Sequence, residues 1–145
     1  MAENGAYGIR GGGTVKADSS IIALHGTANC ETAIDTLGYN LEDGFSCGLS
    51  APAGDVFGVD PLLWALAAVG GSTPTMALGA GSPAIDAGGS AGCPATDQRG
   101  LGRPIDGDED GTPTCDIGAF ELQSLPFFND DFESGDTSAW SATKP

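Results

Sequence analysis

The sequence predicts an all-β fold built from short strands and many turns. Of its 145 residues, 24 are glycine and 9 are proline, and a chain so rich in turn-forming residues is poorly suited to long helices. Hydrophobic residues still make up 40% of the chain, which is enough to form a core and argues against a disordered tail. They occur in short runs between Gly, Asp and Asn, as strands do between tight turns.

The charge of the chain excludes several classes of function. It has 20 acidic and 5 basic residues, and a formal net charge of −15. Since no basic patch can be assembled, we expect no binding to nucleic acid or to anionic membranes. The longest apolar run, PLLWALAAV at 61–69, is too short to insert into a membrane. The N-terminus has no apolar signal segment, so Met1 of a secreted protein would be a fragment start. The composition favours an extracellular protein whose carboxylates take up divalent cations.

Residues 1–60 are predicted to form terminal coils of a β-helix with one loop excursion. The runs TVKA at 14–17 and SIIALH at 20–25 are short strands separated by Asp18 and Ser19. A parallel β-helix requires such strands, because each coil stacks on the next and turns at Gly, Asn or Asp. The run GYNL at 38–41 is expected to be another strand. About one and a half coils are visible, too few to establish a period.

Four cysteines, Cys30, Cys47, Cys93 and Cys115, allow three disulfide pairings. Cys30–Cys47 and Cys93–Cys115 are favoured because each pair brackets a turn-rich loop, and each closure is worth about 3 kcal/mol in the chain-entropy model. These disulfides would place the protein in an oxidising compartment. A zinc site is the weaker alternative, because no pair has CxxC spacing and the chain has a single histidine.

Residues 61–123 are predicted to form a C-terminal cap that contains an acidic loop. Its first segment, 61–66, has proline at the first position followed by good helix formers, which predicts a short helix or helical turn ended by Gly70 and Gly71. Trp64 is expected to be a core or capping aromatic residue; a sugar-binding face is the alternative, which no other feature of the sequence supports.

The acidic loop, DGDEDG at 106–111, predicts a calcium site. Carboxylates at alternate positions converge their oxygens if the backbone curls around one point, and hard cations prefer such a ligand set. The spacing follows an EF-hand loop up to position 12, where Ile117 replaces the usual glutamate. Prolines at 104 and 113 argue against flanking helices, so we expect a structural, loop-type site; a solvated acidic turn is the alternative. The predicted ligands are Asp106, Asp108, Asp110, Thr112 and Asp116.

Other charged residues are interpreted as structural. Asp55 and Asp60 flank the run VFGV and are expected to cap turns rather than to bind a ligand. The two arginines of the cap are expected to pair with nearby carboxylates, and a buried contact of Arg99 would matter most. The carboxylates considered for that contact are Asp86, Asp116 and Glu121.

An ordered series of motifs runs through the chain: FGVDPLL at 57–63, GGSTPTMAL at 70–78, GSPAIDAG at 81–88, DQRG at 97–100 and CDIGAFE at 115–121. Over residues 14–122 the chain resembles the C-terminal region of bacterial surface proteins of the choice-of-anchor Q group. The resemblance implies a right-handed, pectate-lyase-like parallel β-helix closed by a cap, on a secreted or surface-displayed protein. It implies no activity for any named residue. Where relatives often read NGG, this chain reads VGG at 69–71, which is expected to alter a turn.

The last segment, 124–145, carries aromatic residues on an acidic background. It resembles FESGDTSAW-type tails of secreted bacterial proteins and the opening strand of a carbohydrate-binding jelly roll. An isolated strand leaves its backbone unsatisfied. The tail is therefore expected to pack on its own domain, to pair with the sheet edge of another copy, or to be disordered.

These observations predict a non-enzymatic extracellular module, stabilised by calcium, that serves surface display, adhesion or assembly. No catalytic residues are assigned, since chance pairs are common among 20 acids. The expected partners are further copies of the chain and cell-surface or extracellular polysaccharide. One alternative is a fragment of a carbohydrate-active β-helix enzyme, similar to polysaccharide lyases, whose catalytic coils lie upstream. A second alternative is a filament subunit that assembles through strand addition by the tail.

Overall fold

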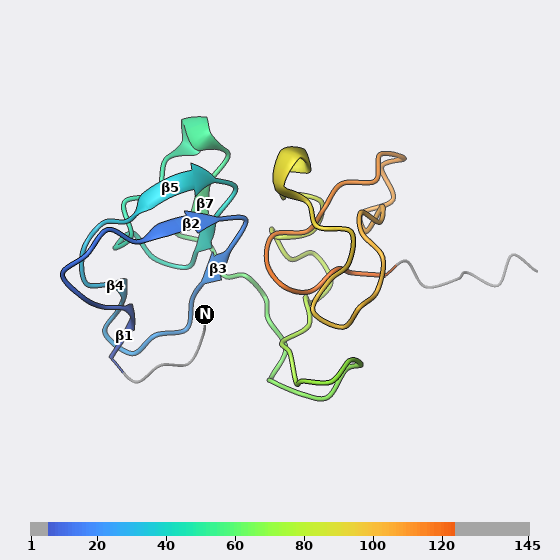
Figure 1. The fold of residues 1–145 in the computed structure, drawn as a ribbon, viewed down its shortest axis with the longest axis horizontal. Coiled ribbons are helices and arrows are strands. Elements are labelled where there is room, and N and C mark those ends of the chain that lie inside the picture. The colour runs from blue at the N-terminus through green and yellow to red at the C-terminus, as the bar shows by residue number, and fades with distance from the viewer. Residues whose placement is uncertain (1–5, 124–145) are drawn as a thin grey trace, which may run out of the picture.

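The structure is a computed structural model that describes residues 6–123, so the predicted tail at 124–145 lies outside the described residues. Within them the regular elements are short strands and two single-turn 3-10 helices, and there is no α-helix (Figure 1). This confirms the all-β fold class. None of the described segments forms a helix long and apolar enough to cross a membrane. The elements are β1 (Tyr7–Ile9), β2 (Lys16–Asp18), β3 (Ile21–Ile22), β4 (Ala28–Cys30), β5 (Asp35–Gly38), β6 (Leu41–Glu42), η1 (Ala51–Ala53), β7 (Val56–Phe57) and η2 (Ser90–Gly92).

The strands form three small sheets, and every strand pair is parallel. β1 pairs with β4, β2 with β5, and β3 with β6, which in turn pairs with β7. Tyr7 lies opposite Ala28, Lys16 opposite Asp35 and Ile21 opposite Leu41. Each of the first three strands therefore pairs with a strand about 20 residues further along the chain. Parallel pairing at this offset places successive segments of the chain on top of one another.

A buried asparagine connects the successive segments where the chain turns between strands. Asn40 donates from Nδ2 to the carbonyl oxygens of Ala17 and Gly38 at 3.1 Å, and its Oδ1 accepts from the Ser20 amide. The buried Asp55 accepts from the Asn40 amide at 2.8 Å. Asp55 thus stabilises a turn, as predicted. The strand predicted over 38–41 is instead interrupted at Tyr39, which has a left-handed φ of 54°.

Both predicted disulfides are present, with Cα–Cα distances of 4.9 Å for Cys30–Cys47 and 6.0 Å for Cys93–Cys115. The first joins the end of β4 to the loop after β6. The carboxylate of Glu42, at the end of β6, organises that loop by accepting from the amides of Ser46 and Cys47 at 2.7 and 3.0 Å. Glu42 is fully buried, so this loop is folded around a carboxylate whose need for hydrogen bonds is met by backbone amides of the loop.

The helix predicted at 61–66 is wrong. Residues 61–79 form a narrow finger in which Leu63 and Leu78, and Ala67 and Thr75, face each other in antiparallel bridges. Leu62 adopts a left-handed φ of 52°, which is incompatible with a right-handed helix. Trp64 donates its amide to the Ala77 carbonyl across the finger. Its side chain is 68% exposed, so the prediction of a core residue is also wrong.

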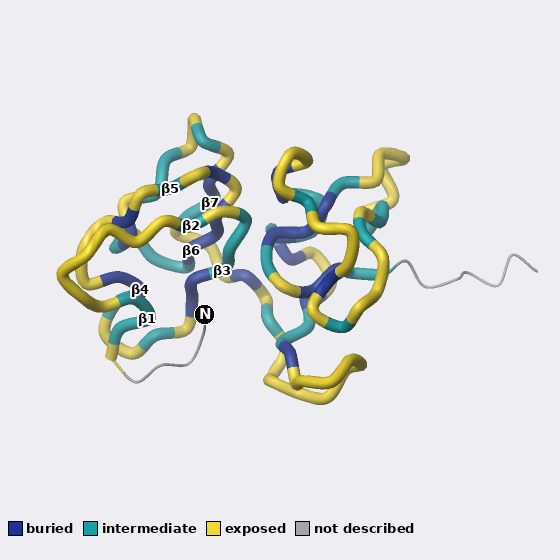
Figure 2. The backbone as a smooth tube through the Cα atoms, in the orientation of Figure 1, coloured by how far each residue is buried: buried dark blue, intermediate teal, exposed yellow. Residues whose placement is uncertain are grey.

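The main hydrophobic core lies between the strands and the C-terminal loops. Its buried members are Leu41 of β6 and Leu78, Ala84, Ile117 and Phe120 of the later part of the chain. Figure 2 shows buried stretches of the backbone both in the part that carries the strands and in the loop-rich part. The core therefore includes residues from both sides of the boundary predicted at residue 60. Through it, the loop-rich cap packs against the strands.

Candidate metal centre

The acidic loop is folded around Asp86, a residue about 20 positions upstream. One oxygen of Asp86, Oδ2, accepts the amides of Gly107 and Asp108 at 2.8 and 2.7 Å. The other oxygen accepts the Thr114 amide at 3.4 Å. Burial raises the pKa of the Asp86 carboxyl above its ordinary value despite these hydrogen bonds, and the charge of Asp108 adds to the rise. A cation at this position would relieve both effects.

Inside the loop, aspartate side chains cap the backbone a few residues further on. Asp106 accepts the amides of Asp110 and Gly111 at 3.1 and 2.9 Å. Asp110 in turn accepts the amide of Thr112 at 2.7 Å. The bond from Thr112 to Asp110 has the spacing of an Asx turn, whereas those to Asp106 span a wider turn. They curl the loop in the way the alternating pattern predicts, and they leave several carboxylate oxygens close together.

Three carboxylates converge among the described residues: those of Asp86, Asp106 and Asp108. One oxygen from each lies within 4.8 Å of the others. Oxygen ligands of calcium lie about 2.3–2.6 Å from the ion, so oxygens at this separation can share one cation. Asp106 and Asp108 were predicted from the sequence, whereas Asp86 was not, because no local spacing connects it to the loop. The roles of Asp110 and Thr112 as ligands stay predictions.

Asp116 lies outside this group of three. Its side chain is buried, and its oxygens accept the amides of Asp86, at 2.9 Å, and of Leu122. Asp116 therefore holds the backbone that presents Asp86, and acts as a support rather than as one of the three converging carboxylates. Burial raises the pKa of Asp116 to about 6.

This raised pKa predicts a pH dependence in the absence of divalent cations. The folded state binds the Asp116 proton more tightly than the unfolded state, whose pKa is the ordinary 3.8. The resulting stabilisation is full below pH 3.8 and is lost as the pH rises through about 6. Urea unfolding in EDTA should therefore show about 2 kcal/mol less stability at pH 7 than at pH 4.5 from this group alone. The Asp116→Asn variant should lack this component; an identical slope in both proteins would contradict the assignment.

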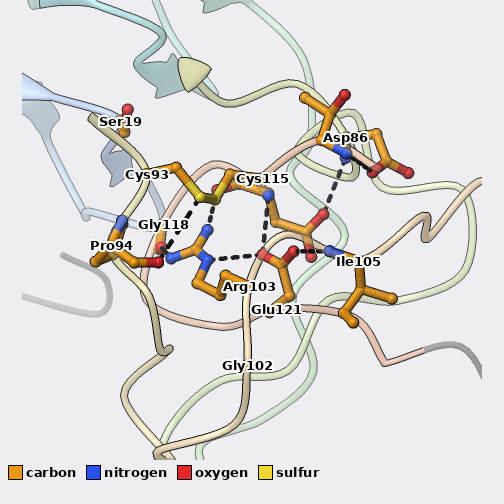
Figure 3. The surroundings of a disulfide bond; sticks show 12 residues. Ser19, Asp86, Cys93, Pro94, Gly102, Arg103, Ile105, Cys115, Gly118 and Glu121 are labelled. Atoms are coloured by element: carbon orange, nitrogen blue, oxygen red, sulfur yellow. Dashed lines mark hydrogen bonds and ion pairs between the residues drawn. A yellow bond between two sulfur atoms is a disulfide. The ribbon is translucent and has the colours of Figure 1, made fainter. Parts of the chain in front are cut away.

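A buried arginine, Arg103, also supports the backbone around Asp116 (Figure 3). The side chain of Arg103 is 4% exposed and its Nε lies 2.7 Å from Glu121 Oε2. Its terminal nitrogens donate to the carbonyl oxygens of Gly118 and Asp116. Glu121 also accepts the amides of Ile105, at 2.7 Å, and of Asp116, at 3.0 Å. The Arg103–Glu121 pair thereby ties both ends of the acidic loop to the segment at residues 118–121.

Arg99 makes a second buried ion pair, with Asp97 at 2.6 Å. Its guanidinium carbon also lies 3.6 Å from the centre of the Phe120 ring, in a cation–π arrangement. Burial alone would raise the pKa of Asp97, but hydrogen bonds from Arg99 and from backbone amides hold it below its ordinary value. The prediction that both arginines pair with carboxylates is confirmed. The partner carboxylate of Arg99 is Asp97, rather than Asp86, Asp116 or Glu121.

The second disulfide fixes this region in place. Cys93–Cys115 lies beside Arg103, and Cys115 directly precedes Asp116 (Figure 3).

Asp60 lies just before the finger, where its Oδ1 accepts the Leu62 amide at 2.8 Å. That contact agrees with the predicted role of Asp60 as a turn cap.

Comparison of the chain with models of protein families, with curated proteins and with solved structures finds no match. The resemblance to bacterial surface proteins of the choice-of-anchor Q group therefore stays a prediction.

Proposed function

We propose that this chain is a non-enzymatic structural module of an extracellular or cell-surface protein, with a cap that calcium stabilises. The observation that carries the proposal is the convergence of Asp86, Asp106 and Asp108, each with one carboxylate oxygen within 4.8 Å of the others. Around this point, disulfide and ion-pair contacts brace the backbone that presents the three carboxylates.

The parallel strands support the β-helix part of the proposal. Each of three strands pairs with a strand one segment later, at an offset of about 20 residues. Successive coils of a parallel β-helix pair in this way. Connections between parallel strands in one sheet are nearly always right-handed, so we infer the last coils of a right-handed β-helix. The loop-rich part of the chain covers the end of that stack.

The buried carboxylates support a structural role. Glu42, Asp55, Asp97 and Glu121 each accept backbone amides, at distances of 3.2 Å or less. A carboxylate used in this way holds the fold, whereas a catalytic acid or base must reach a substrate. Two disulfides favour an oxidising, extracellular setting. Assembly through residues 124–145 stays a prediction, because that segment lies outside the described residues.

Thermal unfolding with and without calcium tests this proposal. Extracellular calcium sites commonly bind at about 0.1–1 mM, so 10 mM calcium should add about 1 to 3 kcal/mol to the free energy of unfolding. Asp106→Asn should abolish most of the gain. Asp35→Asn, at an exposed position in β5, is the matched control and should keep it.

The same protein assayed on polyuronides and neutral glycans tests the enzyme alternative. The proposal expects no turnover of any glycan. Turnover that survives purification would favour a fragment of a carbohydrate-active enzyme, and unchanged unfolding in calcium would contradict the stabilising role.

A further inference from the structure

The finger formed by residues 61–79 exposes an unusual apolar surface. It projects from the body of the molecule (Figure 1), and most of its length is exposed (Figure 2). Trp64 is 68% exposed although tryptophan usually buries most of its large surface. Neighbouring Leu62 and Leu24 are also exposed. The side chain of Trp64 contributes nothing to the hydrophobic core, so its position calls for another explanation.

Trp64 forms one wall of an open depression with a volume of about 570 Å³, which is within the range of small-ligand sites. Leu24, Leu62 and Asp60 line the same depression. The ring lies close to the backbone of Gly79: a Cβ added there would stand 3.0 Å from Trp64 Nε1 and 2.8 Å from the Leu62 carbonyl oxygen. A side chain at position 79 would therefore displace the Trp64 ring, so the ring can take this position only because residue 79 is glycine.

Asp60 supplies a polar group to the same depression. Its Oδ1 accepts the Leu62 amide at 2.8 Å, which fixes the orientation of the carboxylate. Its Oδ2 accepts no hydrogen bond from any residue in the range 6–123 that the structure describes. An exposed aromatic ring beside an oriented acceptor matches a pyranose ring, whose C–H face packs on an aromatic face and whose hydroxyl groups donate to a carboxylate.

We propose that Trp64 and Asp60 form a binding site for a neutral polysaccharide. The ring and the carboxylate together indicate a sugar, and among polysaccharides the net charge of −15 disfavours polyuronides and other anionic chains. The same charge opposes the approach of a second copy of the chain to this face. This inference rests on the proposed extracellular role, for which it names a partner.

The test is titration calorimetry of the full chain with hexasaccharides of β-linked glucose, mannose, xylose and N-acetylglucosamine, and with hexagalacturonate. At least one neutral hexasaccharide should bind, and hexagalacturonate should bind at least tenfold more weakly. Trp64→Ala should weaken binding at least tenfold, and Trp64→Phe should restore part of it. Asp60→Asn, which keeps an oxygen for the Leu62 amide, should weaken binding about threefold to tenfold.

Phe45→Ala is the matched control, because Phe45 is an exposed aromatic residue outside the depression. It should bind the hexasaccharide as the unchanged protein does. Absence of binding by every neutral hexasaccharide would overturn the inference, and so would binding that Trp64→Ala leaves unchanged. Sedimentation of the unchanged protein and of Trp64→Ala completes the test: self-association lost in the variant would identify a protein contact instead. The calcium response of the unfolding temperature, measured on the same samples, tests the proposed function separately.

Discussion

Replacing Arg103 with methionine is expected to lower the free energy of unfolding by about 3 to 5 kcal/mol. The substitution removes the partner of Glu121, whose side chain is fully buried beside Arg103. It also leaves the carbonyl oxygens of Gly118 and Asp116 without the guanidinium. A buried charge without its partner is costly because no water replaces the lost contact. Urea unfolding followed by circular dichroism measures the effect.

Arg10→Met is the matched control for this experiment. Arg10 pairs with Glu31 at 3.3 Å, but its side chain is 69% exposed. Exposed ion pairs are worth about 0 to 1 kcal/mol, so the control should remain close to the unchanged protein. Equal losses in the two variants would show that the buried pair has no special role in the cap.

Ile117→Ala is expected to cost about 2 to 5 kcal/mol, the range for truncation of a fully buried aliphatic side chain. Ile117 packs in the cluster that contains Leu41 of β6 and Leu78 of the finger. Its amide donates to Ala84, and the amide of the next residue, Gly118, donates to Ser19 before β3. A cavity here weakens the contact between the strands and the cap. Unfolding should remain one transition, and hydrogen exchange of the Leu41 amide should accelerate.

Leu37→Ala provides the comparison for this prediction. Leu37 lies in β5 and is 59% exposed, so its truncation should change stability by about 0.5 kcal/mol or less. If Ile117→Ala left the exchange of the Leu41 amide unchanged while the cap unfolded separately, the strands and the cap would be independent units. That result would contradict the shared core.

Features that depend on composition and local spacing were predictable. Glycine and proline content indicated short strands and turns, and both disulfides follow from the loops that the cysteines bracket. The helix at 61–66 was predicted from local propensity, which fails because Leu62 takes a left-handed conformation and Trp64 pairs across the finger. Tertiary pairing overrides a weak local preference in such short segments.

Features that depend on distant contacts were not predictable. The alternating pattern identified Asp106 and Asp108, but the third converging carboxylate, Asp86, is separated from them by about 20 residues. In the same way Glu42 and Glu121 look like any of the 20 acids in the sequence, yet both are fully buried. Burial of a carboxylate requires donors assembled by the fold, and a single sequence does not show which acids obtain them.

Titration of the calcium-free protein with calcium in a calorimeter, at constant ionic strength, tests the central claim most directly. The proposed geometry predicts one saturable binding event per chain, with a dissociation constant of about 0.1–1 mM and an affinity that falls at least tenfold in both Asp86→Asn and Asp108→Asn. Asp35→Asn should bind as the unchanged protein does. Absence of a saturable heat at millimolar calcium, or equal binding by all four proteins, would contradict a calcium site at the converging carboxylates.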